Sequence, residues 1–313
     1  MSQIQPIILI ADEMHPSLFP MLEQAGFAFR YEPTITRSAL IDQIAEYDGL
    51  LIRSKTAVDA DVLNPARRLR FIGRAGAGLD LIDLDITSQR NIQVFHAGEG
   101  NRDAVAEHTV GMLLGLLANI AKGDREVRRG IWDREGNRGY ELSSLTVGIV
   151  GFGNNGHATA RRLSGFGCRV LCYDKYLTRY GGAYAQEAEM EQIMEEADVL
   201  SLHVPLTAET RMMINDAFIA RFEKPFYLIN IARGEVVSLS ALVRGLESGK
   251  IRGACLDVLE NEKLSRLTPD QQAAFDYLRN SDHVVLTPHV AGWTHESYVR
   301  INEVLVSQLK HVR

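Results

Sequence analysis

A glycine turn between an apolar run and a helical pattern limits most strongly what this chain can fold into. The segment Gly151-Phe152-Gly153-Asn154-Asn155-Gly156 directly follows the apolar run 145–150. A strand, a tight glycine turn and a helix start, in this order, are typical of a dinucleotide site. Gly151 permits the turn, Gly153 lets the backbone approach a pyrophosphate, and Gly156 lets helix and strand pack together. A helix that begins near Asn155 directs unpaired N–H groups at the phosphates.

An acidic residue stands where such a site needs one. Asp174 follows a second apolar run, 168–173. Its carboxylate can accept both ribose hydroxyls of the adenosine half, and it repels a 2′-phosphate. The pattern therefore predicts NAD rather than NADP as the cofactor. The alternative is a glycine-rich turn that serves packing alone.

Strand-like runs alternate with helical patterns along the whole chain, which indicates α/β architecture with parallel sheets covered by helices. The first series has strands at 7–10, 27–31, 49–52, 70–73 and 91–95, and helices at 16–26 and 38–45. The second series has six strands, at 145–150, 168–173, 198–202, 226–231, 251–256 and 283–286. Six strands from the glycine turn onward match a complete dinucleotide-binding sheet.

Two longer helices complete the expected order. We expect one continuous helix over 102–129, which connects two domains. We expect a second helix over 294–313, which packs back on the first domain. No internal repeat or low-complexity segment interrupts the series.

The composition limits the class of protein, its partners and the cell compartment in which we expect it. The chain has 313 residues, 46% of them hydrophobic, and a formal net charge of −6, which fits about two globular domains and argues against nucleic acid or an anionic membrane as main partner. The apolar run that opens the chain ends at Asp12, and the run 110–121 is too short to span a bilayer. Three cysteines, Cys168, Cys172 and Cys255, form neither a disulfide framework nor a zinc-type spacing. We expect a cytoplasmic protein without a metal.

Three polar segments follow strands, where a doubly wound sheet binds its ligand. They are 230–234, 256–262 and 287–294. Arg233 offers a planar fork suited to a carboxylate. His289 is a candidate proton donor and acceptor, and Glu262 can fix its tautomer and stabilise the imidazolium. Each residue alone is more typical of a structural or surface role, and the combination favours an active site.

The chain resembles the D-isomer-specific 2-hydroxyacid dehydrogenase family over almost its whole length. The residues that carry the resemblance are Arg53-Ser54, Gly76-Ala77-Gly78-Leu79-Asp80, Ala106-Glu107-His108-Thr109, the glycine turn, His203-Val204-Pro205-Leu206-Thr207, 230–234, Asp257, Glu262 and Pro288-His289.

The resemblance implies a role for each site residue. His289 is the general acid that protonates the substrate carbonyl, Glu262 pairs with it and raises its pKa, and Arg233 holds the substrate carboxylate. Asp257 binds the nicotinamide carboxamide. Cofactor contacts are expected from Gly151, Gly153, Asn154, Asn155, Gly156, Asp174, His203, Pro205, Thr210, Ala232, Asp257 and Gly292. Substrate contacts are expected from Arg53, Ser54, Lys55, Arg74 and the backbone N–H groups of Gly76 and Ala77.

The resemblance also implies a domain plan. A Rossmann-type NAD-binding domain, 101–289, is inserted into a flavodoxin-like substrate-binding domain, 1–100 with 290–313. The cleft between them closes over the substrate and excludes water. Family members are commonly homodimers, and the helix over 102–129 is expected at the interface.

The chain departs from the family pattern at a few positions. Asn155 replaces an apolar residue, Lys263 a proline and Leu81 an asparagine. The stretch 263–277 is longer and more polar than usual, and we interpret it as a solvated excursion, the alternative being an element that alters access to the site.

Within the family, residues 53–56 and 73–76 resemble the D-3-phosphoglycerate dehydrogenase branch. Arg53, Lys55 and Arg74 are expected to gather around a phosphate, where charge-assisted hydrogen bonds are strong; alternatively Lys55 is a solvated cation and Arg53 a structural partner. The implied reaction oxidises 3-phospho-D-glycerate to 3-phosphohydroxypyruvate, the entry to serine synthesis. Because the chain ends at Arg313, we expect no appended regulatory domain and no serine inhibition through one. The alternatives are a hydroxypyruvate or glyoxylate reductase and an NAD-sensing, corepressor-like binding protein.

Overall fold

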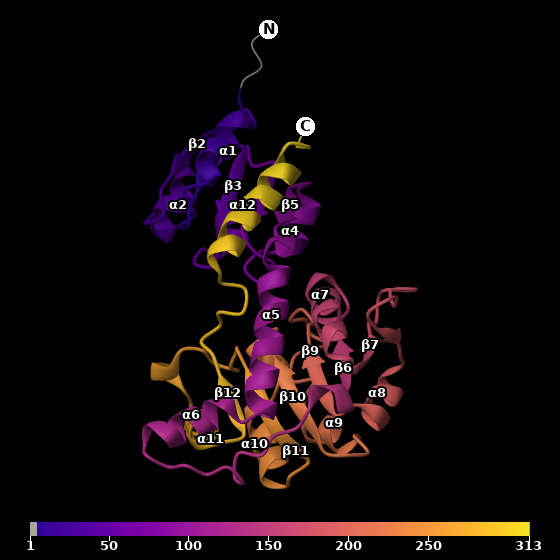
Figure 1. Cartoon of the computed structure of the whole chain (residues 1–313). Helices are drawn as coiled ribbons and strands as arrows, with labels where there is room; N and C mark the ends of the chain where they lie inside the picture. The colour runs from indigo at the N-terminus through magenta and orange to yellow at the C-terminus, as the bar shows by residue number, and fades with distance from the viewer. Residues whose placement is uncertain (1–4, 313) are drawn as a thin grey trace. The chain divides into compact units, whose positions relative to one another are not determined.

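A computed structural model describes residues 5–312, and the chain divides into two compact units (Figure 1). The first unit consists of Met1–Asn101 with Trp293–Arg313, and the second of Arg102–Gly292. The sequence led us to place the boundaries after residues 100 and 289, whereas the units divide after Asn101 and Gly292. Each unit is described below by itself.

The first unit contains a parallel five-stranded sheet in the order β2-β1-β3-β4-β5. This is the flavodoxin-like order 2-1-3-4-5, as predicted. Its strands are β1 (Ile7–Ile10), β2 (Ala28–Tyr31), β3 (Gly49–Ile52), β4 (Phe71–Arg74) and β5 (Gln93–His96).

Both faces of this sheet are covered. The helices are α1 (Leu18–Gln24), α2 (Arg37–Gln43), α3 (Ala60–Leu63), α4 (Leu84–Gln89) and α12 (His295–Leu309). Alternation along β1 directs Ile8 and Ile10 into one core cluster and Leu9 into the other. Helix α12 starts at a capping box of Thr294 and Ser297 and packs against α1, β4 and β5, as predicted for the C-terminal helix.

The second unit contains a parallel seven-stranded sheet in the order β12-β11-β10-β9-β6-β7-β8. The strands are β6 (Thr146–Val150), β7 (Arg169–Tyr173), β8 (Gln186–Glu187), β9 (Val199–Leu202), β10 (Phe226–Asn230), β11 (Ile251–Leu256) and β12 (Val284–Leu286). Counted from the glycine turn, this is the Rossmann order 3-2-1-4-5-6 with β12 as a seventh strand. The expected count of six was therefore wrong. Strand β8 was missed because its two exposed polar residues form no apolar run.

The helices of this series are α5 (Gly98–Leu117), α6 (Ile120–Arg128), α7 (Asn154–Leu163), α8 (Met190–Glu196), α9 (Asp216–Ala220), α10 (Leu239–Glu247) and α11 (Pro269–Asn280). The prediction of one helix over 102–129 was wrong. Helices α5 and α6 meet at a bend of 59°. Asn119 between them has φ 54°, in the left-handed region that ends a helix and that asparagine adopts more readily than most residues.

The polar stretch 263–277 is only partly a solvated excursion. Leu264–Arg266 forms an exposed 3-10 turn, but the following residues belong to α11. That helix begins at a Thr268–Gln271 capping box with Pro269 in its first turn. Ala274 and Leu278 are buried in the core on the side where α11 packs against α10.

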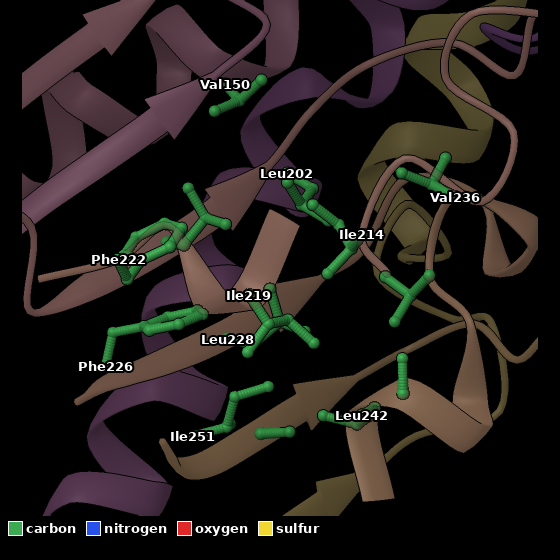
Figure 2. Packing of buried hydrophobic residues seen from close by; sticks show 14 of the residues in the cluster. Val150, Leu202, Ile214, Ile219, Phe222, Phe226, Leu228, Val236, Leu242 and Ile251 are labelled. Atoms are coloured by element: carbon green, nitrogen blue, oxygen red, sulfur yellow. The ribbon is translucent and has the colours of Figure 1, made fainter. Parts of the chain in front are cut away.

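Figure 2 shows part of the apolar core between the second sheet and its helices. Phe222 and Phe226 stack with ring centroids 3.9 Å apart, and Leu228, Ile214 and Leu242 are fully buried in the same cluster. This core fixes the carboxyl ends of the strands, from which the candidate site residues extend. Within residues 5–312 no single helix is long and apolar enough to cross a membrane, and the bent pair α5–α6 meets that test by length and composition alone.

Candidate active site

The glycine turn has the geometry that the sequence predicted. Gly151 has φ +91°, and a Cβ there would lie 2.7 Å from the carbonyl oxygen of His203. A Cβ on Gly156 would lie 2.1 Å from the carbonyl oxygen of Gly151, so the glycine allows the close packing of α7 on the turn. Gly153 is the N-cap of α7, has no capping side chain, and faces open space. The first N–H groups of α7 are thus available to an anion, which fits a pyrophosphate.

Asp174 holds the neighbouring loop against this turn. Its Oδ2 accepts a hydrogen bond from the Phe152 N–H at 2.9 Å. Its Oδ1 accepts from the N–H groups of Tyr176 at 2.9 Å and Leu177 at 3.1 Å. The carboxylate also lines a hollow of about 500 Å³ together with Lys175, Arg179 and other residues after β7. A hollow at this position fits the adenosine half of a dinucleotide.

The loop after β9 carries three further expected cofactor residues. The His203 ring lies 2.8 Å from the Ser201 hydroxyl, and burial lowers the pKa of His203 to about 3, so the imidazole is neutral. The Thr210 hydroxyl donates to the Pro205 carbonyl at 2.6 Å. The side chain of Thr210 therefore closes the loop on itself, next to the glycine turn.

His289 and Glu262 form a hydrogen-bonded pair in the second unit. His289 Nδ1 lies 3.0 Å from Glu262 Oε2 and 2.9 Å from Glu262 Oε1, with both side chains about half exposed. The hydrogen bond to Glu262 raises the pKa of His289 above its ordinary value, against the opposing effect of burial. Because Nδ1 faces the carboxylate, Nε2 is the nitrogen left for a reacting group.

The backbone at His289 is strained. Its φ of 55° lies in the left-handed region, which costs a non-glycine residue about 1–2 kcal/mol. Such strain persists only where surrounding contacts fix it, and it is concentrated at functional sites.

Asp257, which directly follows β11, supplies those contacts. Its side chain is fully buried, and its carboxylate accepts from the Thr287 hydroxyl at 2.5 Å and from the N–H groups of Val290 at 2.9 Å and Ala291 at 2.8 Å. Its carbonyl accepts from the His289 N–H at 2.7 Å. In this structure Asp257 holds the His289 loop, while its contact with a carboxamide stays a prediction.

Arg233 lies in the loop after β10. Its Nη1 donates to the Ala232 carbonyl at 2.7 Å, and the Asn230 amide donates to the Arg233 carbonyl at 2.9 Å. The Ala232 N–H is bound to Asn230 Oδ1 at 3.1 Å. The Arg233 charge also acts on the pKa of His289, which it lowers. The second unit thus brings together the three residues Arg233, Glu262 and His289 predicted for catalysis.

In the first unit, Arg53 lies against two aromatic rings. Its guanidinium carbon is 3.9 Å from the centre of the Trp293 ring and 4.9 Å from that of Tyr298. Its Nη1 donates to the Tyr298 hydroxyl at 3.1 Å. Such contacts orient a guanidinium while leaving it charged.

The three cations expected at a phosphate have different partners. Lys55 Nζ donates to the Pro33 carbonyl at 2.6 Å and lines a hollow of about 300 Å³ with Thr36 and Arg37. The Arg74 guanidinium covers Gly76, where a Cβ would lie 1.3 Å from Nη1. The Gly76 N–H donates to the Arg74 carbonyl at 2.9 Å. Ser54 is exposed and Ala77 half-buried. Each cation thus has a contact within the first unit: Arg53 with two aromatic rings, Lys55 with the Pro33 carbonyl, and Arg74 with the Ala75 carbonyl.

Sequence reasoning did not identify several residues that contact the candidate site residues. Asp12 is 2% exposed, and it accepts from the Arg53 N–H at 2.6 Å and the Thr56 hydroxyl at 2.5 Å. An acidic residue directly after a buried strand was the available signal. Tyr298 and His108 also lie beside site residues, but nothing local in the sequence indicates their partners. Among residues 5–312 no three or more His, Cys, Asp or Glu side chains are placed to hold a metal ion.

Comparison with known proteins decides the family. Residues 110–291 match the family of the D-isomer specific 2-hydroxyacid dehydrogenase, NAD binding domain. The chain belongs to this family. The matched residues, the NAD-binding domain, contain the glycine turn, Asp174, Arg233, Asp257, Glu262 and His289.

Proteins similar to this chain include dehydrogenases and reductases that are named for different hydroxy or keto acids. A D-3-phosphoglycerate dehydrogenase of Archaeoglobus fulgidus is 31% identical over 96% of this chain and 56% of its own length, so the chain spans little more than half of that relative. A glyoxylate reductase of Thermofilum pendens is 37% identical over 88% of this chain and 80% of its own length. A crystal structure of D-lactate dehydrogenase from Aquifex aeolicus, complexed with NAD and lactic acid, superposes with a TM-score of 0.83 at 29% identity, covering 97% of this chain and 94% of that one.

Proposed function

We propose that this chain is an NAD-dependent oxidoreductase that interconverts a D-2-hydroxy acid and its 2-keto acid. The observation that carries the proposal is the His289–Glu262 pair beside Arg233, in a domain that binds NAD. A proton donor, its charged partner and a carboxylate-binding cation are the groups that this reaction requires.

The chemistry follows from these side chains. NAD, when bound, supplies the hydride acceptor or donor. His289 Nε2 holds the proton that the substrate oxygen gains in reduction, and it accepts that proton in oxidation. Glu262 keeps Nδ1 protonated and favours the imidazolium. Arg233 binds the substrate carboxylate through its planar fork, which orients the carbonyl toward His289.

We infer that the first unit supplies substrate-binding groups, with Arg53, Lys55 and Arg74 bound to a phosphate. The substrate would then be 3-phospho-D-glycerate and the product 3-phosphohydroxypyruvate. In support, several similar proteins are D-3-phosphoglycerate dehydrogenases. The Arg53 guanidinium lies against Trp293 and Tyr298, and these contacts orient it while leaving its charge available to an anion.

A second candidate is a reductase of hydroxypyruvate or glyoxylate. Two observations favour it. Lys55 Nζ has an internal partner, the Pro33 carbonyl. The glyoxylate reductase of Thermofilum pendens shares more identity, and is matched over more of its length, than the D-3-phosphoglycerate dehydrogenase described above.

One experiment separates the candidates. NADH consumption is measured with 3-phosphohydroxypyruvate, hydroxypyruvate, glyoxylate and pyruvate at matched concentrations. A strong preference for the phosphorylated acid supports the phosphate contacts, and Lys55→Met should then raise KM for that acid alone. Equal or better turnover of an unphosphorylated acid contradicts them. Tight NADH binding without turnover of any of these acids contradicts the dehydrogenase proposal and favours a binding protein.

We also propose that the chain forms a homodimer through an apolar surface on and after α6. This surface consists of Ile120, Val127, Ile131, Trp132 and Tyr140, whose exposed fractions range from 48% to 81%. Several large apolar side chains exposed on neighbouring segments of the chain are typical of an interface. Sedimentation of a Trp132→Arg variant tests it, with a monomer as the expected result. A variant that stays dimeric, or a wild-type chain that is monomeric, contradicts the proposal.

A further inference from the structure

A polar chain links helix α5 to the loop that carries His289. Thr287 Oγ1 lies 2.5 Å from Asp257 Oδ1 and 3.0 Å from His108 Nε2. His108 Nε2 is itself 3.6 Å from Asp257 Oδ1. Strands β11 and β12 are parallel neighbours, so Asp257 and Thr287 meet at one edge of the sheet, and His108 reaches them from α5. His108 and Thr287 had no assigned role in the reaction.

Proton counting fixes the direction of these bonds. A threonine hydroxyl has one proton, and the buried Asp257 carboxylate is a stronger acceptor than the other neighbours of Thr287, His108 and the Met112 sulfur 3.5 Å away. Thr287 therefore donates to Asp257. Its oxygen must then accept from His108, so His108 carries a proton on Nε2. The order of donors runs from His108 through Thr287 to Asp257.

Asp257, the last acceptor in this series of hydrogen bonds, determines where His289 lies. The Asp257 carboxylate accepts from the backbone N–H groups of Val290 and Ala291, and the Asp257 backbone carbonyl accepts from the N–H of His289. The carboxylate therefore holds the two residues that directly follow the left-handed turn at His289. A buried carboxylate that loses one donor must recover it from another group, since an unsatisfied charge is costly. Loss of the Thr287 hydroxyl would therefore disturb the same carboxylate that orients the His289 loop.

We propose that His108 and Thr287 are positioning residues, which act through Asp257 to hold His289 against Glu262. The proposal deepens the proposed dehydrogenase function and rests on it for its kinetic consequence. Its structural consequence, the position of the His289 ring against Glu262, can be measured without turnover. The charged groups that face the His289 ring within the second unit are Glu262, Arg233 and Asp257.

Matched variants separate hydrogen bonding from shape. Thr287→Val removes the hydroxyl and keeps the volume, whereas Thr287→Ser keeps the hydroxyl. His108→Leu removes the donor, whereas His108→Gln retains an N–H near the position of Nε2. The Thr287→Val/His108→Leu double variant measures whether the two residues act together.

The first measurement is the titration of His289 in the protein without substrate, by NMR of ¹³C,¹⁵N-labelled histidine. The signal is identified among the nine histidines by its loss in His289→Asn. Because the contact with Glu262 raises the pKa of His289, Thr287→Val and His108→Leu should move the titration to more acidic pH, and the Ser and Gln variants should restore it. An unchanged midpoint in both Thr287→Val and His108→Leu overturns the proposal, whether or not the chain is a dehydrogenase.

The second measurement is the pH profile of kcat/KM for keto acid reduction. Thr287→Val should lower kcat by about 10- to 100-fold, the usual effect of a small misplacement of a catalytic group, and move the alkaline limb to lower pH. The effects of Thr287→Val and His108→Leu should be less than additive. Fully additive effects, or loss of kcat with an unmoved pH limb, would show a merely structural role. Should Thr287→Val fail to fold, the His108→Leu and His108→Gln pair gives the same comparison.

Discussion

Glu262 Oε2 and His289 Nδ1 lie 3.0 Å apart, although 27 residues separate them in the sequence. The pair joins the segment after β11 to the loop after β12, two neighbouring parallel strands. This contact gives His289 a raised pKa and leaves Nε2 free of the carboxylate. Four predictions concern this pair, the His289 ring, Asp174 and the three cysteines.

The first concerns pH. In the proposed reaction, reduction of a keto acid requires protonated His289, so its rate should be maximal below the raised pKa of His289 and should fall as pH increases through that pKa. Oxidation of the hydroxy acid requires the neutral ring, so its rate should rise as pH increases through the same pKa. Glu262→Gln removes the charge, lowers the pKa of His289, and should shift both profiles to more acidic pH. Rates measured in both directions across pH 5–10 check this, and unshifted profiles would contradict it.

The same shift affects stability. A histidine with a raised folded pKa stabilises the fold below its unfolded pKa of about 6.5, and this contribution is lost as pH rises through the folded value. Because both side chains are about half exposed, solvent screens the pair and the effect on unfolding is small. Glu262→Gln should therefore change activity profiles much more than thermal unfolding.

The second prediction isolates the His289 ring. His289→Asn is the suitable change, because asparagine tolerates the left-handed backbone that His289 adopts. We expect turnover to fall by about 100-fold or more, the usual contribution of a positioned general acid, while NADH binding stays nearly intact. Stopped-flow kinetics and NADH fluorescence titration measure the two quantities. Near-normal turnover would remove His289 from the proton-transfer step.

The third prediction concerns Asp174. Asp174→Ala removes the acceptor for the N–H groups of Phe152, Tyr176 and Leu177 and the charge that repels a 2′-phosphate. NADH should bind about tenfold or more weakly, since hydrogen bonds to a charged group are strong, and discrimination against NADPH should relax. Asp174→Asn is the matched control, because it keeps an acceptor but no charge. If neither variant alters the NADH to NADPH ratio of Kd values, other residues decide the preference.

The fourth prediction concerns the thiols. Burial raises the pKa of Cys172 to about 12, and it also raises the pKa values of Cys168 and Cys255. Thiolates are the reactive form, so the native protein should resist alkylation at pH 8. Mass spectrometry after iodoacetamide treatment, with and without denaturant, checks this. Rapid labelling of Cys255 in the native state would contradict it.

Local patterns sufficed for those features that neighbouring residues determine. The glycine turn with Asp174 and all strands except β8 were predictable because periodicity and turn chemistry are local, whereas the flavodoxin-like order of the first sheet was implied by the family resemblance alone. The bend at Asn119 was not predictable, because the helical pattern continues on both sides of it and a single asparagine, although it favours caps and turns, does not by itself end a helix. The bonds of Asp257 to residues 287–291 were not predictable either, since they depend on partners 30 or more residues away.

The contacts of single cations were the least predictable. Lys55 and Arg53 are adjacent to the same serine, yet one donates to the Pro33 carbonyl and the other lies on the Trp293 ring. Long flexible side chains choose partners from the surrounding fold. The residue types indicated an anion site, whereas the geometry alone shows how each cation is held.

The bend at Asn119 affects how fast the amide protons of α6 exchange with solvent. Beyond it, α6 is a nine-residue helix with no buried side chain. A helix of that length is marginal in water without tertiary burial, and polar contacts such as Arg125–Asp282 and Glu126–Asn137 tie it to the rest of its unit. In the proposed homodimer the partner would cover α6, so its amide protons should exchange faster as the protein is diluted. Their exchange rate would then measure dimer dissociation without any substrate, and a rate that does not depend on concentration would contradict the dimer.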